Sequence, residues 1–141
     1  MGQIIYQGKL YSTFEGFNQN AIFKMNNGTY WVQAQYRYWY HYKYRPDVTI
    51  VLENGQYIMF VEGQSIQVRR LYDVIESNID GAFEGWNGDT VYRLMNGQTW
   101  KQKEYKYEYK YAYNPDVIIA DINGTYVMQV EGTQVEVMRI D

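Results

Sequence analysis

The sequence of 141 residues contains no cysteine, and this absence removes several kinds of chemistry. Without cysteine the chain forms no disulfide, carries no thiol nucleophile and has no cysteine-ligated metal site, as is usual in a reducing compartment. No apolar run approaches the ~18 residues of a membrane-spanning helix. Residues 1–6 lack the basic and continuous apolar segments of a secretory signal. We therefore expect a cytoplasmic protein whose fold depends on packing alone.

Motifs of the common enzyme classes are also missing. The sequence has no nucleophile elbow, no phosphate-binding loop and no histidine pair with metal-ligand spacing. The single histidine, His41, lies among tyrosines. Carboxylates recur at matching positions, such as Glu15 and Glu84, but they stand beside glycine or proline, where turn formation explains them. We expect a protein that is not an enzyme, with no catalytic residues, no cofactor and no metal.

Two runs of tyrosine at every second position dominate what is present. Side chains alternate between the two faces of a β-strand, so each run places its phenol rings on one face. The runs predict two long strands, and the first, Trp31 to Tyr44, would extend about 45 Å. A strand of that length either bends sharply or projects from a small domain. The tyrosines are Tyr36, Tyr38, Tyr40, Tyr42 and Tyr44, and then Tyr105, Tyr107, Tyr109, Tyr111 and Tyr113.

The sequence aligns with itself at a shift of 69 positions without a gap. From residue 14 to residue 71, 26 of the 58 aligned pairs are identical. Because so high an identity indicates one structural unit present twice, we predict a first β-barrel repeat at 1–71 and a second at 72–141. Identical pairs include Trp31 with Trp100, Gln33 with Gln102, Pro46 with Pro115 and Gly63 with Gly132.

The spacing of predicted strands and turns in each unit is typical of a small all-β domain. Alternating apolar residues predict five or six short strands, and the Asn-Gly pairs at Asn27-Gly28 and Asn54-Gly55 are strong hairpin signals. No segment has a convincing helical period. About 70 residues bury little surface, so we expect the two units to share an interface. The predicted fold class is all-β, with two tandem small antiparallel barrels, Src-homology-3-like, related by internal duplication and packed together.

The residues between the tyrosines differ in charge between the two units. Residues 1–71 carry seven basic and four acidic side chains, whereas residues 72–141 carry six and twelve. This asymmetry favours either contact between opposite halves of two copies or phosphate binding by the first unit, or it reflects drift of solvated charge after duplication. The intervening residues are Arg37, Trp39, His41, Lys43 and Arg45 in the first unit, and Lys106, Glu108, Lys110, Ala112 and Asn114 in the second.

We interpret the tyrosine faces as surfaces for binding or assembly. Exposed apolar patches mark interaction sites, and tyrosine combines an apolar ring with a hydroxyl that tolerates water. We expect a homo-oligomer, with a protein or peptide partner as a further option and no membrane partner. The candidate binding or interface residues are Arg37, Tyr38, Trp39, Tyr40, His41, Tyr42, Tyr44, Tyr107, Tyr109 and Tyr111.

Three alternatives stay open. In the first, the tyrosines roof the barrels or fill a groove between the units, because aromatic cross-strand pairs are ordinary sheet stabilisers. In the second, the basic and aromatic strand of the first unit binds single-stranded nucleic acid, although the net charge of −3 and the lack of an RNA-binding motif oppose this. The third, a carbohydrate surface, is weaker because nothing places a polar fork beside a ring.

A longer motif is best developed in the second unit. It contains Gly81, Phe83-Glu84-Gly85-Trp86-Asn87-Gly88-Asp89-Thr90, Leu94, Asn96-Gly97-Gln98, Trp100, Gln102 and the tyrosines leading to Pro115 and Val117. With this motif the chain resembles a small bacterial domain of unknown function, found in uncharacterised bacterial proteins that include products of integron gene cassettes. The resemblance covers almost all of both units, and the first departs at Phe17, Gln19-Asn20 and Thr29. It implies a small β-barrel and no assigned activity.

Overall fold

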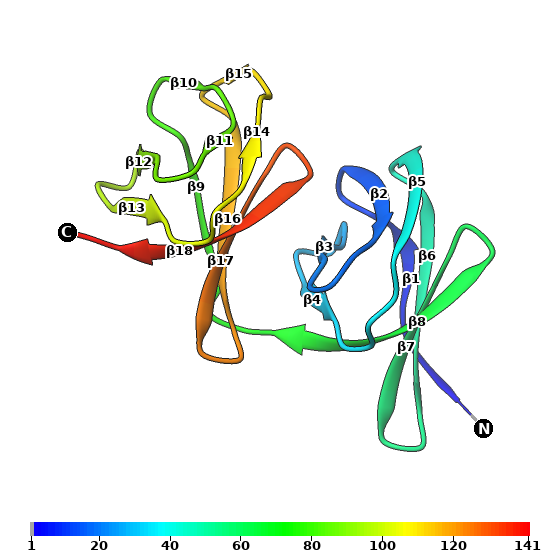
Figure 1. Ribbon diagram of the computed structural model, residues 1–141. Coiled ribbons are helices and arrows are strands. Elements are labelled where there is room, and N and C mark those ends of the chain that lie inside the picture. The colour runs from blue at the N-terminus through cyan, green and yellow to red at the C-terminus, as the bar shows by residue number, and fades with distance from the viewer. Residues whose placement is uncertain (1) are drawn as a thin grey trace. The chain divides into compact units, whose positions relative to one another are not determined.

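The computed structural model describes residues 2–141, and this part of the chain consists of antiparallel strands and connecting turns (Figure 1). The all-β fold predicted from the alternating pattern is therefore confirmed. The chain divides between Tyr72 and Asp73 into two compact units. Across the described residues, no helix is long and apolar enough to cross a membrane.

The first unit is built on a six-stranded antiparallel sheet in the order β1-β6-β7-β8-β4-β3, and the remaining strands, β2 and β5, pair with each other (Figure 1). The sheet curls, because an isolated bridge joins Leu10, just after β1, to Met25, just after β3. The strands are β1 (Gln3–Lys9), β2 (Thr13–Phe17), β3 (Ile22–Lys24), β4 (Tyr30–Gln33), β5 (Trp39–Tyr44), β6 (Asp47–Glu53), β7 (Gln56–Val61) and β8 (Gln64–Leu71).

The second unit repeats this order. Its large sheet runs β12-β13-β18-β17-β16-β9, and two short pairs, β10 with β15 and β11 with β14, stand where the first unit has β2 and β5. The bridge between Ile79 and Leu94 corresponds to the one between Leu10 and Met25. The strands are β9 (Ile75–Asn78), β10 (Ala82–Phe83), β11 (Trp86–Asn87), β12 (Val91–Arg93), β13 (Thr99–Gln102), β14 (Tyr107–Glu108), β15 (Ala112–Tyr113), β16 (Asp116–Ile122), β17 (Thr125–Val130) and β18 (Thr133–Arg139).

Tight turns set the register of the sheets. Asn54 and Gly55 both have positive φ, 53° and 75°, and join β6 to β7 in a two-residue hairpin. This is the turn that an Asn-Gly pair favours, because these residues tolerate the left-handed region better than others do. The predicted hairpin at Asn27-Gly28 also forms, between β3 and β4. The Asn-Gly signals therefore located these hairpins from sequence.

Each unit has a core of its own. The two cores contain tryptophan, phenylalanine and aliphatic side chains that alternate along the strands, as a half-buried sheet requires. No tyrosine of the two alternating runs belongs to either core. The largest fully buried side chains include Phe14, Trp31, Ile50 and Met59 in the first unit, and Phe83, Trp86, Trp100, Ile119 and Met128 in the second.

The prediction of one continuous strand from Trp31 to Tyr44 is wrong. Strand β4 ends at Gln33 and β5 begins at Trp39, so the chain bends instead of projecting. In the second unit the break is more pronounced, because the corresponding stretch is divided among β13, β14 and β15. Alternation of side chains along the sequence does not reveal such a break, since a bent chain and a straight one carry the same pattern.

A buried glutamine amide explains the break in the first unit. The side chain of Gln33 is 4% exposed, and its nitrogen donates to the carbonyls of Gln35 and Arg37, both at 3.0 Å, and to that of Asn18. Its oxygen accepts from the Asn18 amide at 2.9 Å. A buried amide is costly unless its donors and acceptor are satisfied, so the chain after β4 turns around this side chain.

Gln102 does the same in the second unit. It is 3% exposed and donates to the carbonyls of Glu104 at 3.0 Å and Lys106 at 2.8 Å. Its oxygen accepts from the amides of Asn87 at 3.2 Å and Gly88 at 3.1 Å. The two glutamines therefore fix the point at which each tyrosine run leaves the large sheet.

We predict that Gly85 is required by a close approach between chain segments. Its φ is +96°, and a Cβ atom there would lie 2.0 Å from the Glu108 carbonyl oxygen. Gly85→Ala should lower the free energy of unfolding by about 3 kcal/mol or more, measured by urea denaturation. Gly124→Ala is the matched control, because its φ is +90° and a Cβ atom there would have no described residue within 4 Å except its two chain neighbours. It should cost only about 1 kcal/mol. Equal losses would show that the close approach is not limiting.

Candidate functional site

The first tyrosine ladder, Tyr36, Tyr38, Tyr40, Tyr42 and Tyr44, lies on β5 and on the segment before it. Its side chains are between 60% and 76% exposed. Within the described chain β5 pairs with β2 alone, so its other edge has no strand partner (Figure 1). The ladder is therefore an exposed aromatic face on an edge strand.

The second tyrosine ladder, Tyr105, Tyr107, Tyr109, Tyr111 and Tyr113, is carried by β14, β15 and the residues around them. Its side chains are between 57% and 83% exposed. Neither ladder contributes to a core, so the alternative in which the tyrosines roof the barrels is wrong for these ten side chains. In both units the rings face outward and their hydroxyls are open to solvent.

The opposite face of β5 is directed inward. Trp39 lies with its ring centroid 5.4 Å from that of Phe17 and 6.1 Å from that of Phe14. His41 stacks on Trp39 at 4.7 Å with an angle of 9° between the rings, and its Nε2 lies 2.9 Å from a carboxylate oxygen of Glu62. The aromatic residues between the tyrosines therefore pack against the core instead of forming an open platform.

Two of the cations at the intervening positions, Arg37 and Arg45, also have partners. Arg37 donates to the Ser65 carbonyl at 2.7 Å and to the side chain of Gln64, and its guanidinium lies 5.5 Å from the Phe17 ring centroid. Arg45 donates to the side-chain oxygen of Asn26 at 3.1 Å. Arg37, just before β5, and His41, within it, thus tie this segment to the turn between β7 and β8 and to the start of β8.

In the second unit different side chains make the equivalent connection. Lys106 donates to the Gln134 carbonyl at 2.9 Å, and Lys110 donates to the Glu131 carbonyl at 2.5 Å. The Thr133 hydroxyl accepts from the Trp86 indole at 2.9 Å and donates to Glu108 at 3.0 Å. Both tyrosine segments are therefore held mainly by their own side chains, which donate to main-chain carbonyls in and just after the turn between the last two strands of the unit.

The structure divides the ten predicted binding or interface residues into two groups. One group is exposed on the outer faces, and the other is half-buried on the inner face of β5 and of the segment just before it. They do not form one continuous surface, because neighbouring positions of a strand point in opposite directions. The outward group contains Tyr38, Tyr40, Tyr42, Tyr44, Tyr107, Tyr109 and Tyr111, and the inward group contains Arg37, Trp39 and His41.

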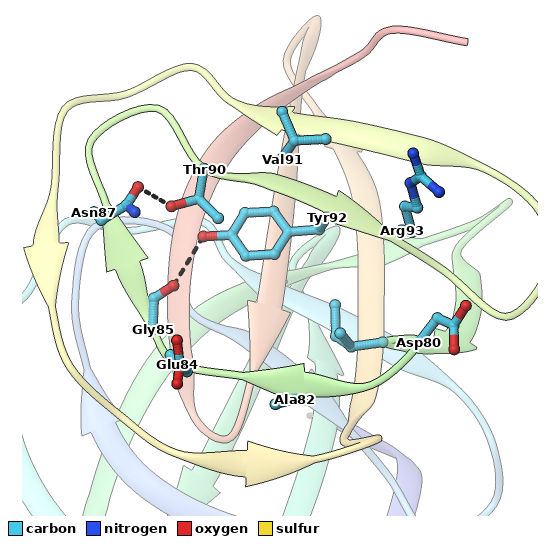
Figure 2. A pocket seen from close by; sticks show the side chains of 10 residues that line it. Asp80, Ala82, Glu84, Gly85, Asn87, Thr90, Val91, Tyr92 and Arg93 are labelled. Atoms are coloured by element: carbon cyan, nitrogen blue, oxygen red, sulfur yellow. Dashed lines mark hydrogen bonds between the residues drawn. The ribbon is translucent and has the colours of Figure 1, made fainter.

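A pocket in the second unit was not predicted from the sequence. It has a volume of about 490 Å³ and lies between the segment containing β10 and strand β12 (Figure 2). Three charged side chains line it, those of Asp80, Glu84 and Arg93, together with the apolar surface of Ala82 and the ring of Tyr92. These segments are brought together by the hydrogen bond from the Asp80 amide to the Arg93 carbonyl, at 2.8 Å.

The equivalent position in the first unit is occupied differently. At the shift of 69, Asp80 corresponds to Tyr11 and Arg93 corresponds to Lys24. The Lys24 ammonium lies 4.0 Å from the centroid of the Tyr11 ring, a cation–π contact. The signal for the pocket was therefore present in the self-alignment, as the replacement of an aromatic and a lysine by a carboxylate and an arginine.

Tyr92 forms the floor of the pocket. Its side chain is buried, and its hydroxyl donates to the Gly85 carbonyl at 2.9 Å (Figure 2). Burial raises the pKa of Tyr92 to about 12, and a hydrogen bond with the Thr90 side chain opposes part of this rise. The phenol is therefore a neutral donor throughout the physiological range, and it holds the chain at Gly85 against β12.

Neither a metal centre nor a related protein identifies the site. Among residues 2–141, no three histidine, aspartate or glutamate side chains gather in a group able to hold a metal ion. Comparisons with protein-family models, with curated proteins and with solved structures found no match to this chain. The resemblance to a small bacterial domain therefore stays a prediction.

We predict that Tyr92 makes stability fall in alkaline solution. Because its pKa is raised in the folded state, its contribution is complete below about pH 10 and is lost as the pH rises through about 12. The loss should be on the order of 2 kcal/mol, measured by urea denaturation across this range. In Tyr92→Phe, which restores the residue type of Phe23 in the first unit, the decline should be shallower. Identical slopes for both proteins would exclude Tyr92 as the cause.

Proposed function

We propose that this chain is a non-enzymatic binding or assembly module and that the two tyrosine ladders are its contact surfaces. The observation that supports the proposal is the exposure of the ten tyrosines, each more than half exposed and outside both cores. Contiguous exposed aromatic surface is uncommon on monomeric proteins unless it serves an interaction. Tyrosine suits an interface because its ring buries a large area while its hydroxyl finds a partner at the rim.

The form of the ladders favours an extended partner. Neighbouring tyrosines on one face of a strand are about 6.6 Å apart, which is also the side-chain spacing on one face of a second strand. The free edge of β5 offers main-chain donors and acceptors to such a partner, in the manner of strand addition. A second copy of the chain or an extended peptide supplies both features, and we favour the second copy.

We infer further that each unit is a small barrel of the Src-homology-3-like type and that the two arose by internal duplication. Supporting this, their large sheets have the same strand order, and their backbone hydrogen bonds recur at the shift of 69. For example, the Leu10 amide donates to the Pro46 carbonyl at 3.0 Å, as the Ile79 amide does to that of Pro115. The matching bridges near Leu10 and Ile79 bring the two ends of each curled sheet together.

Single-stranded nucleic acid is the alternative partner. It would stack its bases on the first tyrosine ladder and place phosphates near basic side chains. Of the five residues between the tyrosines of this unit, however, only Lys43 is exposed, and Arg37 and His41 are bound within the unit. Because these side chains are already bound within the unit, we favour assembly over nucleic-acid binding.

If the chain self-associates, its mass in solution should rise with protein concentration. Sedimentation velocity over a wide concentration range measures this directly. Tyr40→Ser combined with Tyr42→Ser should shift the protein to monomer without loss of stability, because both side chains are exposed. Tyr109→Ser with Tyr111→Ser is the matched variant in the second unit, and a weaker effect there would assign the contact to the free edge of β5. A wild-type protein that stays monomeric at every concentration would contradict self-assembly.

The salt dependence of binding distinguishes nucleic acid from a second copy of the chain as the partner. Binding to phosphates releases counterions, so affinity for nucleic acid falls steeply as salt rises. We expect no binding of a labelled oligothymidylate at physiological salt, measured by fluorescence anisotropy. Tight binding that weakens steeply with salt and that is lost in Lys43→Gln would favour the nucleic-acid function instead.

A further inference from the structure

The pocket of the second unit has the size and lining of a small-molecule site. Its volume of about 490 Å³ lies within the range of roughly 300–1,000 Å³ that is typical of ligand pockets. Such pockets combine apolar surface with a few polar groups that fix the orientation of the ligand. Here the apolar part comes from Ala82 and Val91, above the buried ring of Tyr92, and the charged groups come from Asp80, Glu84 and Arg93.

The three charged groups are available to a ligand. Asp80, Glu84 and Arg93 are exposed, and their charged ends take part in no side-chain hydrogen bond or ion pair with another described residue. Their formal charges sum to −1. The pocket therefore offers two acceptors and one cationic donor without an internal partner, and a ligand of net positive charge complements it.

The charged groups stand at two ends of the pocket. The Asp80 amide donates to the Arg93 carbonyl, which places these residues beside each other at one end. At the other end the Tyr92 hydroxyl donates to Gly85, the residue that follows Glu84. Figure 2 shows Asp80 and Arg93 on one side, Glu84 on the other, and Ala82 and the Tyr92 ring between them. An anion and a cation at one end are thus separated by apolar surface from a second anion.

We propose that this pocket binds a basic α-amino acid, with L-lysine as the reference ligand. The Arg93 guanidinium takes the α-carboxylate, for which its planar fork is well shaped, and Asp80 takes the α-ammonium. The aliphatic stem lies along the exposed apolar surface of Ala82 and Val91, and Glu84 takes the terminal ammonium. This assignment uses each of the three charged groups once and leaves none unpaired.

The first unit supplies an internal comparison. It retains Glu15 where the second unit has Glu84, but Tyr11 and Lys24 stand in place of Asp80 and Arg93. The Lys24 ammonium lies 4.0 Å from the centroid of the Tyr11 ring. An α-amino acid finds no carboxylate there for its α-ammonium. The site is therefore assigned to the second unit alone, and it is independent of the tyrosine ladders.

The test uses ligands that each lack one group. L-Norleucine lacks the terminal ammonium, 1,5-diaminopentane lacks the carboxylate, and Nα-acetyl-L-lysine lacks the α-ammonium. Binding to the whole chain is followed by amide chemical shifts in nuclear magnetic resonance titrations. L-Lysine should shift resonances within 79–93, and each analogue should bind about two- to fivefold more weakly, as exposed ion pairs predict. Binding of Nα-acetyl-L-lysine as strong as that of L-lysine would overturn the assignment of the α-ammonium to Asp80.

Each variant removes the charged side chain that is assigned to the group missing from one of the analogues. Glu84→Gln should weaken the binding of L-lysine by about the same two- to fivefold factor and leave the binding of L-norleucine unchanged. Arg93→Gln should leave the binding of 1,5-diaminopentane unchanged. Asp80→Asn should leave Nα-acetyl-L-lysine unaffected. Glu15→Gln in the first unit is the control and should change nothing. Absence of shifts in 79–93 with L-lysine, or equal weakening of all four ligands by each variant, would overturn the proposal. Unchanged urea denaturation of the variants excludes misfolding as the cause of lost binding.

Discussion

The hydrogen-bonding requirement of one buried glutamine in each unit decides how the tyrosines are displayed. The amides of Gln33 and Gln102 are almost fully buried and accept and donate bonds that only a turning chain supplies. An unsatisfied buried amide would cost several times what one exposed hydrogen bond contributes. The chain therefore leaves the large sheet after the glutamine, and the tyrosines that follow lie on short, separate strands. Without this turn the ladder would extend the large sheet.

The separated tyrosine strands are secured through their inner faces. In the first unit Arg37 and His41 reach the turn between β7 and β8, and in the second unit Lys106 and Lys110 reach the turn between β17 and β18. The side chains differ, but they connect the same two parts of the unit. Side-chain anchoring leaves the second edge of β5 without a strand partner among residues 2–141, and an unpaired edge is the usual template for adding another strand. The geometry that exposes the tyrosines thus also makes strand addition available to them.

The two units differ in their exposed side chains more than in their strand order and backbone hydrogen bonds. Strand order and backbone hydrogen bonds recur at a shift of 69, whereas the side chains around the bridge between the ends of the sheet differ between the units. Tyr11 and Lys24 cover that position in the first unit, and Asp80 and Arg93 line a pocket there in the second. A repeated framework tolerates such divergence, because the backbone bonds that hold it do not depend on the exposed side chains. Two distinct surfaces, a ladder and a pocket, are thereby carried by one architecture.

The sequence by itself determined the period-two alternation, and with it the all-β fold and the hairpins at Asn27-Gly28 and Asn54-Gly55, whereas the exposure of the tyrosines was seen only in the structure. The strands and hairpins are local features, because alternation and turn propensity act between near neighbours. Only the tertiary structure decided that β4 ends at Gln33, that Arg37, Trp39 and His41 face inward, and that Asp80 stands beside Arg93. The inward contacts and the pairing of Asp80 with Arg93 depend on partners 13 or more positions away, and the turn at Gln33 depends both on nearby carbonyls and on Asn18, 15 positions away. No local pattern specifies the distant partners.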